Sequence, residues 1–368
     1  MTPQALMAGL SNLMGTPNVP AYTPIGKLIA NGDIAQGQMA TLAGSVNGVP
    51  FEPSYLGDLG IYDYDGAMTR IIEVEFDSQV INLIQTSAPG SPGQETELNL
   101  RTVKAISAPR IARTVTVNAM EVAEIRALAS TDLETVKTRA DRKLINAVRD
   151  IRTTLEYHRV GGAMGILLDA DGTTVLQNYF TLLGVTQPTF NVQFGTAGSS
   201  KFVQIGATLL NMLEDALGNL SPSGEPPIVL CGRTFWQRFI SSADVVNAYQ
   251  YFEATKQKFL PNREDLRYAD FEFGGIVWRQ WRGQAANGAG RFIPDTQAQL
   301  LVPGVSGTYL GLFCPPEDQV SKVNTKGIPI YPTVKVLDHD QGYEIRLQSN
   351  PLHIMTRPAA AIELYSSN

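Results

Sequence analysis

Apolar and polar residues alternate along residues 70–117, a pattern that predicts extended chain. In "TRIIEVEFDSQVINLI" the apolar side chains of Ile72, Val74 and Phe76 alternate with acidic ones, which is the period of a β-strand with two different faces. The Gly- and Pro-rich "SAPGSPGQE" then predicts a turn, and "TELNLRTVKAISAPRIARTVTV" resumes the alternation. Residues 66–117 are therefore expected to form a long two-stranded ribbon. Because an isolated two-stranded ribbon is marginally stable in water, it needs a partner surface.

Residues 131–160 carry the clearest helical pattern of the chain. Thr131 and Glu134 have the spacing of a capping box, and Gly161 and Gly162 are expected to end the helix. At 1.5 Å per residue the helix would be roughly 43 Å long, which suggests a structural spine. Its apolar stripe recurs at steps of three and four and consists of Leu133, Val136, Ala140, Leu144, Ala147, Ile151, Leu155 and His158.

The rest of the chain predicts an α+β protein with several parts. Residues 1–65 are rich in Gly, Ala, Pro and Met without a sustained period, which indicates an extended arm. A hairpin turning at Asp171-Gly172 follows the long helix. Helical and strand patterns then alternate, with helices over 201–220 and 233–252 and strands at "PIVLCG" and "FEFGGIVWRQWRG". The expected parts are an arm at 1–65, a ribbon at 66–117, a domain with the long helix at 118–200, an α/β lobe at 201–310 and return strands at 311–368.

Charge and composition exclude several classes of protein. The net charge is −6 at pH 7 and the charged fraction is 17%, so the chain lacks the basic excess of a dedicated nucleic-acid binder. Any contact with nucleic acid is expected to be weak and local. Cys231 and Cys314 each end an apolar run and are interpreted as small buried residues. The first 15 residues lack the basic segment of a secretory signal, and no apolar run reaches the length of a membrane span.

The run "DHD" at 338–340 invites a metal or catalytic interpretation. If this segment is extended, Asp338 and Asp340 point one way and His339 the other, so the three side chains do not converge on one ion. His353 lies beyond the Asn350-Pro351 break, and its position relative to His339 is open. A metal-dependent enzyme that uses Asp338, His339, Asp340 and His353 is therefore kept as a minor alternative.

Other candidate motifs are better explained by structure. "DADG" at 169–172 lacks the spacing of a calcium loop, and "GGAMG" at 161–165 closes a helix where a dinucleotide-binding loop would open one. The Arg-Trp alternation of "VWRQWR" at 277–282 has no basic surroundings, so packing or a subunit contact is favoured over nucleic-acid binding. "GYEIRLQS" is an amphipathic strand that should end or bend at Pro351. No motif predicts a cofactor, a metal site or an enzymatic activity.

Two C-terminal motifs resemble the phage major capsid protein E family, the lambda-type major head proteins. They are "VNTKGIPIYPTVKV" at 323–336 and "QSNPLHIMTRP" at 348–358, preceded by "FCPPEDQ" at 313–319. "LEYHRVGGAMG" further resembles the end of the family's long helix. The sequence departs from the family where His353 replaces a Pro and Pro315-Pro316 replaces Ala-Pro, and the arm has no match. The matching residues are Val323, Asn324, Thr325, Gly327, Pro329, Tyr331, Gln348, Ser349, Asn350, Pro351, Arg357 and Pro358.

This resemblance implies the HK97-like capsid fold, with an N-terminal arm, an extended E-loop, a peripheral domain with a long spine helix and an axial α/β domain. It implies a major capsid protein that self-assembles into hexamers and pentamers of an icosahedral shell around phage double-stranded DNA. Scaffold and portal proteins are the implied partners, with a decoration protein as an optional one and weak, non-specific contact to DNA. The implied location is the virion, and the host cytoplasm during assembly. An encapsulin-like nanocompartment shell is the alternative with the same fold, and Arg346 and Arg357 become candidates for ion pairs between subunits.

Overall fold

The computed structural model describes most of the chain from Ser54 onward. The greater part of the expected arm, the tip of the ribbon and the expected helix cap at Thr131 and Glu134 lie outside the described residues. The structure describes residues 54–77, 101–121, 136–194, 201–217, 225–247, 270–283 and 291–367.

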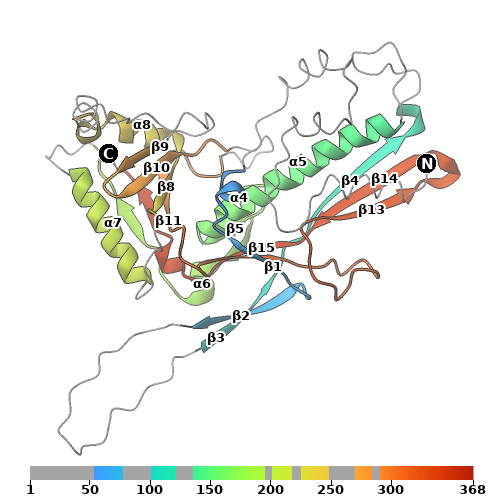
Figure 1. Ribbon diagram of the computed structural model, residues 1–368, viewed down its shortest axis with the longest axis horizontal. Coiled ribbons are helices and arrows are strands. Elements are labelled where there is room, and N and C mark those ends of the chain that lie inside the picture. Colours follow the sequence, from blue (N-terminus) through green and yellow to red (C-terminus); the bar gives the residue numbers. More distant parts are fainter. Residues whose placement is uncertain are drawn as a thin grey trace, which may run out of the picture.

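The long helix α5 (Val136–Ala163) confirms the expected spine and lies along a three-stranded antiparallel sheet (Figure 1). The sheet has the order β13 (Tyr331–Val336), β14 (Gly342–Ser349) and β4 (Ile111–Asn118). We call α5 with this sheet the spine lobe. Its core combines the predicted stripe of the helix with alternate residues of the strands, namely Ala140, Leu144, Ala147, Ile151, Leu155, Val115, Val117, Ile345 and Leu347.

Two glycines near the end of α5 have a different role from the one expected. Gly161 and Gly162 do not stop the helix, which continues to Ala163, and the left-handed conformation falls on Gly165 with φ of 82°. A Cβ atom on Gly162 would lie 2.8 Å from the backbone oxygen of His353 and 2.9 Å from the Tyr62 hydroxyl. Gly162 therefore lets α5 pack against a neighbouring strand at a distance that a side chain would prevent.

The α/β lobe is built on a mixed six-stranded sheet (Figure 1). α7 (Lys201–Leu217) and α8 (Arg233–Ser241) belong to this lobe, and both confirm predicted helices. α8 is shorter than expected because Ser242 is extended and donates its hydroxyl to the Phe239 carbonyl, although residues 243–247 are helical again. The strand order is β7 (Thr189–Asn191), β16 (Glu363–Tyr365), β11 (Gln297–Leu301), β8 (Ile228–Cys231), β10 (Ile276–Gln280) and β9 (Asp270–Phe273).

A small sheet of three strands lies between the two lobes. β12 (Tyr309–Phe313) runs parallel to β1 (Asp63–Gly66) and antiparallel to β15 (Pro351–Met355). Helix α4 (Tyr55–Leu59) precedes β1, and the side chains of Tyr55 and Leu56 are buried in the main core. Residues 55–65 were expected in the arm, but their apolar side chains belong to this core.

The segment after α5 follows the predicted hairpin and leads into a short helix. β5 (Ile166–Leu168) and β6 (Val175–Asn178) are antiparallel, and Gly172 takes the left-handed conformation at the expected turn. The Asn178 side chain caps α6 (Tyr179–Leu183) by accepting from the Thr181 amide. Three 3-10 turns, at Ala119–Glu121, Asp338–Asp340 and Pro358–Ala360, complete the described elements.

The ribbon consists of β2 (Ile71–Asp77) and β3 (Arg101–Ser107) and points away from the body of the molecule (Figure 1). The returning segment was expected to be one strand, but it divides at residues 108–110 into β3 and β4. Pro109 has no amide hydrogen to give to a ladder, so the strand breaks there. Among the described strands, β3 pairs with β2 alone, whereas β4 joins the spine lobe.

A buried polar network holds α4 and β1 against the C-terminal end of α5. The Glu156 carboxylate, which is 0% exposed, accepts from the backbone amides of Leu56 (2.6 Å) and Gly57 (3.2 Å) and from Arg159 (2.9 Å). Arg159 also donates to the hydroxyl of Tyr64 at 2.6 Å. The carboxylate is therefore matched by three donors, as a buried charge requires.

Two buried histidines make the stability of the protein dependent on pH. Burial lowers the pKa of His158 to about 4 against the opposing effect of Asp169, and burial with the nearby Arg159 lowers the pKa of His353 well below its ordinary value. The folded state therefore holds both rings neutral, and its stability is fully present above pH 6.5 and lost as the pH falls.

We expect the free energy of unfolding to fall by about 1.4 kcal/mol per pH unit for His158 alone between pH 6.5 and about 4. His158→Leu should remove this part of the slope in denaturant titrations of the protein at a series of pH values. His339→Gln, at an exposed histidine, is the matched control and should keep it. Equal slopes for all three proteins would contradict the assignment.

Candidate functional site

The second predicted motif marks the point where the chain leaves one sheet and enters another. β14 ends at Ser349 and β15 begins at Pro351, so the expected break at Asn350-Pro351 is confirmed. Ahead of the break, β14 pairs with β4 and β13, and beyond it β15 pairs with β12. Gln348, Ser349, Asn350 and Pro351 are all buried. This stretch therefore joins the spine lobe to the small central sheet.

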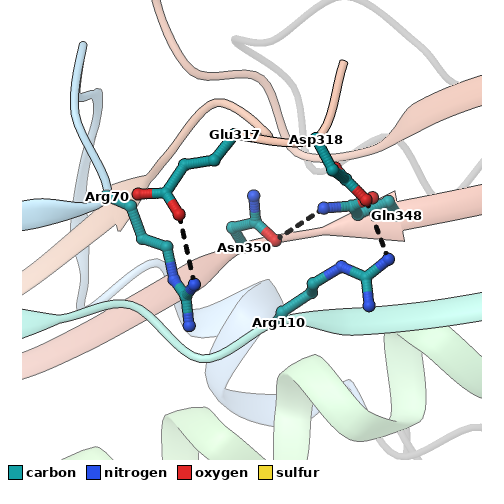
Figure 2. A pocket seen from close by; sticks show the side chains of 6 residues that line it. All are labelled: Arg70, Arg110, Glu317, Asp318, Gln348 and Asn350. Carbon is teal, nitrogen blue, oxygen red and sulfur yellow. Dashed lines mark hydrogen bonds and ion pairs between the residues drawn. The ribbon is translucent and has the colours of Figure 1, made fainter. Parts of the chain in front are cut away.

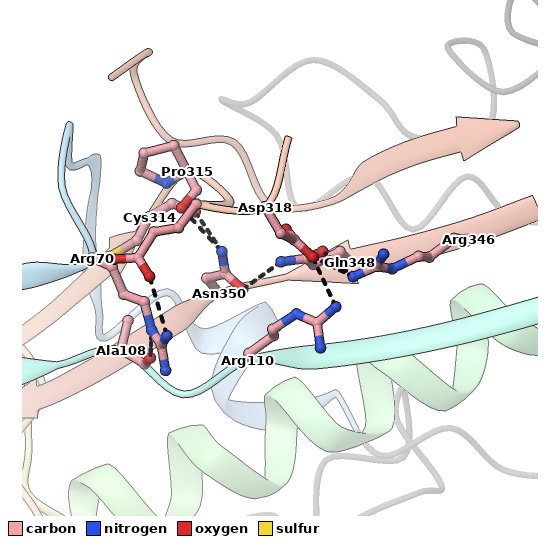
Figure 3. Close-up of polar contacts among 10 residues, drawn as sticks. Arg70, Ala108, Arg110, Cys314, Pro315, Asp318, Arg346, Gln348 and Asn350 are labelled. Carbon is pink, nitrogen blue, oxygen red and sulfur yellow. Dashed lines mark hydrogen bonds and ion pairs between the residues drawn. The ribbon is translucent and has the colours of Figure 1, made fainter. Parts of the chain in front are cut away.

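Asn350 supplies the polar contacts that the break requires (Figure 3). Its side-chain nitrogen donates to the carbonyl oxygens of Cys314 (3.4 Å) and Pro315 (3.1 Å). Its side-chain oxygen accepts from Gln348, and its backbone oxygen accepts from the Cys314 amide at 2.9 Å. An asparagine carries both donors and acceptors on one short side chain, so this residue can close the gap left between two strand ladders.

Gly327, from the first motif at 323–336, lies near the junction at Asn350 where β14 ends and β15 begins. Its amide donates to the Ala67 carbonyl at 2.8 Å, and a Cβ atom here would lie only 1.7 Å from the Phe313 oxygen. The position therefore requires glycine for space. Asn324 is exposed in the preceding loop with φ of 58°, a conformation that Asn tolerates, and Pro329 is half-buried.

Arg357 and Pro358, the last two residues of the second motif, lie at the α/β lobe. Arg357 donates to the carbonyl of Leu217 at the end of α7 at 3.4 Å, and Pro358 begins the 3-10 turn that follows β15. Arg346 forms an ion pair with Asp318 of the same chain at 2.5 Å. Both arginines therefore have a partner within the chain, and their ion pairs between subunits stay a prediction.

Charged residues gather beside Asn350 at the base of the ribbon and line an open cavity of about 300 Å³ (Figure 2). Arg70 pairs with Glu317 at 3.4 Å, and Asp318 is shared between Arg110 at 3.0 Å and Arg346. We call these five residues the ribbon-base cluster. Sequence reasoning missed Arg70 and Arg110, because they are far from residues 317–318 along the chain; the acidic pair in "PPEDQ" was the signal available.

The ribbon-base cluster connects the ribbon to the body at several points. Arg70 lies directly before β2, and its Nε donates to the Ala108 carbonyl at 3.0 Å on the other side of the ribbon. Glu317 and Asp318 belong to the loop after β12. The side chains of the pairs are 34–60% exposed, so each pair contributes at most about 1 kcal/mol and salt screens it. The cluster can therefore orient the ribbon without fixing it rigidly.

The "DHD" segment is a turn and not a strand. Asp338–Asp340 form the tight connection between β13 and β14, and His339 takes a left-handed φ of 58°. The alternation expected for an extended segment is therefore wrong here. His353 is 1% exposed on β15, where its Nε2 lies 3.3 Å from the Tyr64 hydroxyl, and the length of β14 separates it from His339. Within the described ranges, no three His, Cys, Asp or Glu side chains are grouped as a metal site.

The tryptophans and cysteines that were considered as functional residues are part of the protein core. Trp278 and Trp281 are buried, and Trp278 stacks on Phe239 with ring centroids 4.5 Å apart, which confirms the packing interpretation. Cys231 and Cys314 are buried free thiols, as expected, and burial raises the pKa of Cys314 to about 11. No helix in the described part of the chain is long and apolar enough to span a membrane.

Comparisons of the sequence with known proteins agree on phage major capsid proteins. The family model described as phage major capsid protein E matches residues 38–366. The major capsid protein of Pseudomonas phage KPP10 is 22% identical over 319 residues, which cover 83% of this chain and 90% of that protein.

Solved capsid structures resemble the whole architecture. The capsid of cyanophage P-SCSP1u gives a TM-score of 0.50 at 13% identity over 100% of this chain and 99% of that chain. The capsid of Myoviridae phage XM1 gives 0.52 at 8% identity over 86% and 93%. These likenesses confirm the expected α+β, HK97-like capsid fold. With the family model matched over most of its length, the chain belongs to the phage major capsid protein E family.

Proposed function

We propose that copies of this chain self-assemble into the icosahedral head of a tailed phage, with the subunits arranged in hexamers and pentamers around double-stranded DNA. Its role is structural rather than enzymatic. Scaffold and portal proteins would assist assembly in the host cytoplasm, a decoration protein could be added, and the product would be the virion shell. Membership of the capsid family supports this function, and the geometry of the ribbon is the observation that carries it.

The two faces of the ribbon have opposite surroundings. Ile72, Val74 and Ile106 share one face and pack against the main core. The other face carries the exposed Glu73 together with Ile71 and Val103, which are 60% and 50% exposed. Exposed apolar side chains on a projecting two-stranded ribbon are unfavourable in an isolated subunit, but contact with a neighbouring copy would bury them.

The ribbon-base cluster gives the ribbon a defined direction with some freedom. Its ion pairs are weak one by one and partly exposed. Subunits in hexamers and pentamers have to meet at different angles, so a ribbon hinged on such pairs suits both kinds of capsomer. The spine lobe, in contrast, has a continuous apolar core and supplies the rigid part of each subunit.

Electron microscopy of the expressed chain, alone and with a scaffold protein, should reveal closed shells or tubes. The physical reason is that Ile71 and Val103, which stand beside acidic residues on the outward face of the ribbon, lose their exposed apolar surface when another copy covers them. A protein that stays monomeric at all concentrations and salt conditions tested would contradict the proposal.

A charge on the outer face of the ribbon should block assembly without unfolding the subunit. For Val103→Glu we expect shells to disappear in sedimentation and negative-stain images, while the melting temperature of the subunit stays close to that of the wild type. Such surface changes alter stability by only about 0.5 kcal/mol. Val103→Thr keeps the shape and strand preference without the charge, and this control should still form shells. Normal shells from Val103→Glu would remove the ribbon face from the interface.

Removing the Asn350 side chain should lower the stability of the unassembled subunit. Asn350→Ala leaves the buried carbonyls of Cys314 and Pro315 without their donor, which costs about 1–3 kcal/mol in the free energy of unfolding. Urea titration of unassembled subunits measures this loss. Asn146→Ala, at an exposed asparagine on α5, should shift the curve by less than about 0.5 kcal/mol. Equal shifts for the two variants would show that the bonds of Asn350 contribute no net stability.

A further inference from the structure

Residues 54–66 lie across the C-terminal end of α5 and lead into the ribbon, whose first strand begins at Ile71 (Figure 1). We call this segment, which contains α4 and β1, the strap. β1 is the edge strand of the small central sheet, and among the described strands it pairs with β12 alone. β12 and β15 can therefore stay paired if the strap leaves.

The hydroxyl of Tyr64 connects the strap to two other elements. It accepts from the Nε of Arg159 on α5 at 2.6 Å and lies 3.3 Å from the Nε2 of His353 on β15. Arg159 sets the direction of this chain, because a guanidinium group can only donate. The hydrogen of Tyr64 is then available to His353, and a neutral imidazole nitrogen can accept it. His353 therefore holds the strap as a hydrogen-bond acceptor.

A protonated His353 does not fit this arrangement. The ring is 1% exposed and lies edge-on to Tyr62 and Tyr64, with ring centroids 5.1 Å and 6.0 Å away. Its Nδ1 has no hydrogen-bond partner in the described part of the chain, and the residue opposite on β12 is Gly311, which has no side chain. A proton would give the ring two N–H groups and leave the hydrogen of Tyr64 without its acceptor, and unmatched buried polar groups are costly.

The other charged and titratable groups that face the ring give a second positive charge no partner. α5 contributes Arg159, His158 and Glu156, and the Tyr179 hydroxyl of α6 donates to the backbone oxygen of His353 at 2.6 Å. The Glu156 carboxylate is already bound by Arg159 and two amides of the strap. Burial, together with Arg159 and His158, lowers the pKa of His353. A proton on His353 would thus place a second cation beside Arg159.

We propose that uptake of a proton by His353 releases the strap from the end of α5, so that acid loosens the start of the ribbon while the spine lobe stays folded. Burial of Tyr55 and Leu56 in the main core keeps the strap in place at neutral pH, and the core of the spine lobe contains no strap residue. The sequence departs from the family at His353, where a Pro could not take up a proton, so the device is a property of this chain. Its consequence for contacts between copies rests on the proposed function, but the release itself does not.

Glu156 acts in the opposite direction and has to be separated in the test. Burial raises the pKa of Glu156 against the opposing effect of Arg159, so the closed strap gains from a proton on this carboxyl as the pH falls. His353 has the reverse sign. Because its pKa is lowered in the folded protein, its contribution to the closed strap is fully present above pH 6.5 and is lost as the pH falls. Two proteins that both contain Glu156 therefore have to be compared at the same pH.

Hydrogen–deuterium exchange of the unassembled full-length protein, read by mass spectrometry on peptides of the strap and of α5, measures the release. The amides of Leu56 and Gly57 are bonded to Glu156, so their exchange reports opening of the strap. Their protection in the wild type, divided by that in His353→Gln at the same pH, should fall by up to about tenfold for each pH unit below 6.5. In the wild type the strap should also exchange faster than the middle of α5, because it opens without complete unfolding.

His339→Gln makes the same substitution at an exposed histidine and should follow the wild type. His353→Leu, which also cannot take up a proton, repeats the comparison if the Gln variant folds poorly. Equal pH dependence in the wild type and the His353 variants overturns the inference. Exchange of the strap that is no faster than that of α5 also overturns it, because the strap would then open only when the whole protein unfolds. Neither outcome involves shells, so the proposed function is tested separately.

Discussion

The chain from Gly342 to Met355 belongs to two sheets, and the rest of the structure depends on how it changes from one to the other at Asn350. Backbone groups at such a break lose their strand partners and have to be bonded in another way. Asn350 achieves this with its amide group and its own carbonyl, which bind residues 314 and 315. The two sheets can then meet at one point, and α5 packs on both, against β14 and β15.

This junction decides where the ribbon leaves the molecule. β1 and the loop after β12 meet at Gly327, where there is no room for a side chain. The same loop carries Glu317 and Asp318 to the arginines at the base of the ribbon. A buried junction, closed by the hydrogen bonds of Asn350, thus stands directly beside a set of weak and partly exposed ion pairs. A shell subunit needs both, because its body has to keep its shape while its ribbon adapts to neighbours.

Titratable residues such as His353, which suggested a metal or catalytic site in the sequence, are part of the protein core. His353 is buried between the rings of Tyr62 and Tyr64, and Glu156 is held by Arg159 and two backbone amides. These groups connect α4, β1, α5 and β15 through polar and ring contacts. Buried polar groups of this kind specify how elements pack, whereas the apolar stripe of α5 supplies most of the driving force.

The sequence by itself determined the elements whose signal is local: α5, α7, the hairpin at Asp171-Gly172 and the strand break at Pro351. Periodicity, turn residues and the missing amide hydrogen of proline act within a few residues, so they can be read without the fold. A family resemblance also singled out Gln348 and Asn350, which the structure places where β14 ends and β15 begins. Tertiary structure alone decided that Arg70 and Arg110 meet residues 317–318, that residues 55–65 join the core, and that Gly162 fits against His353. These contacts join residues that are 100 to 247 positions apart, and no local pattern records a partner at that distance.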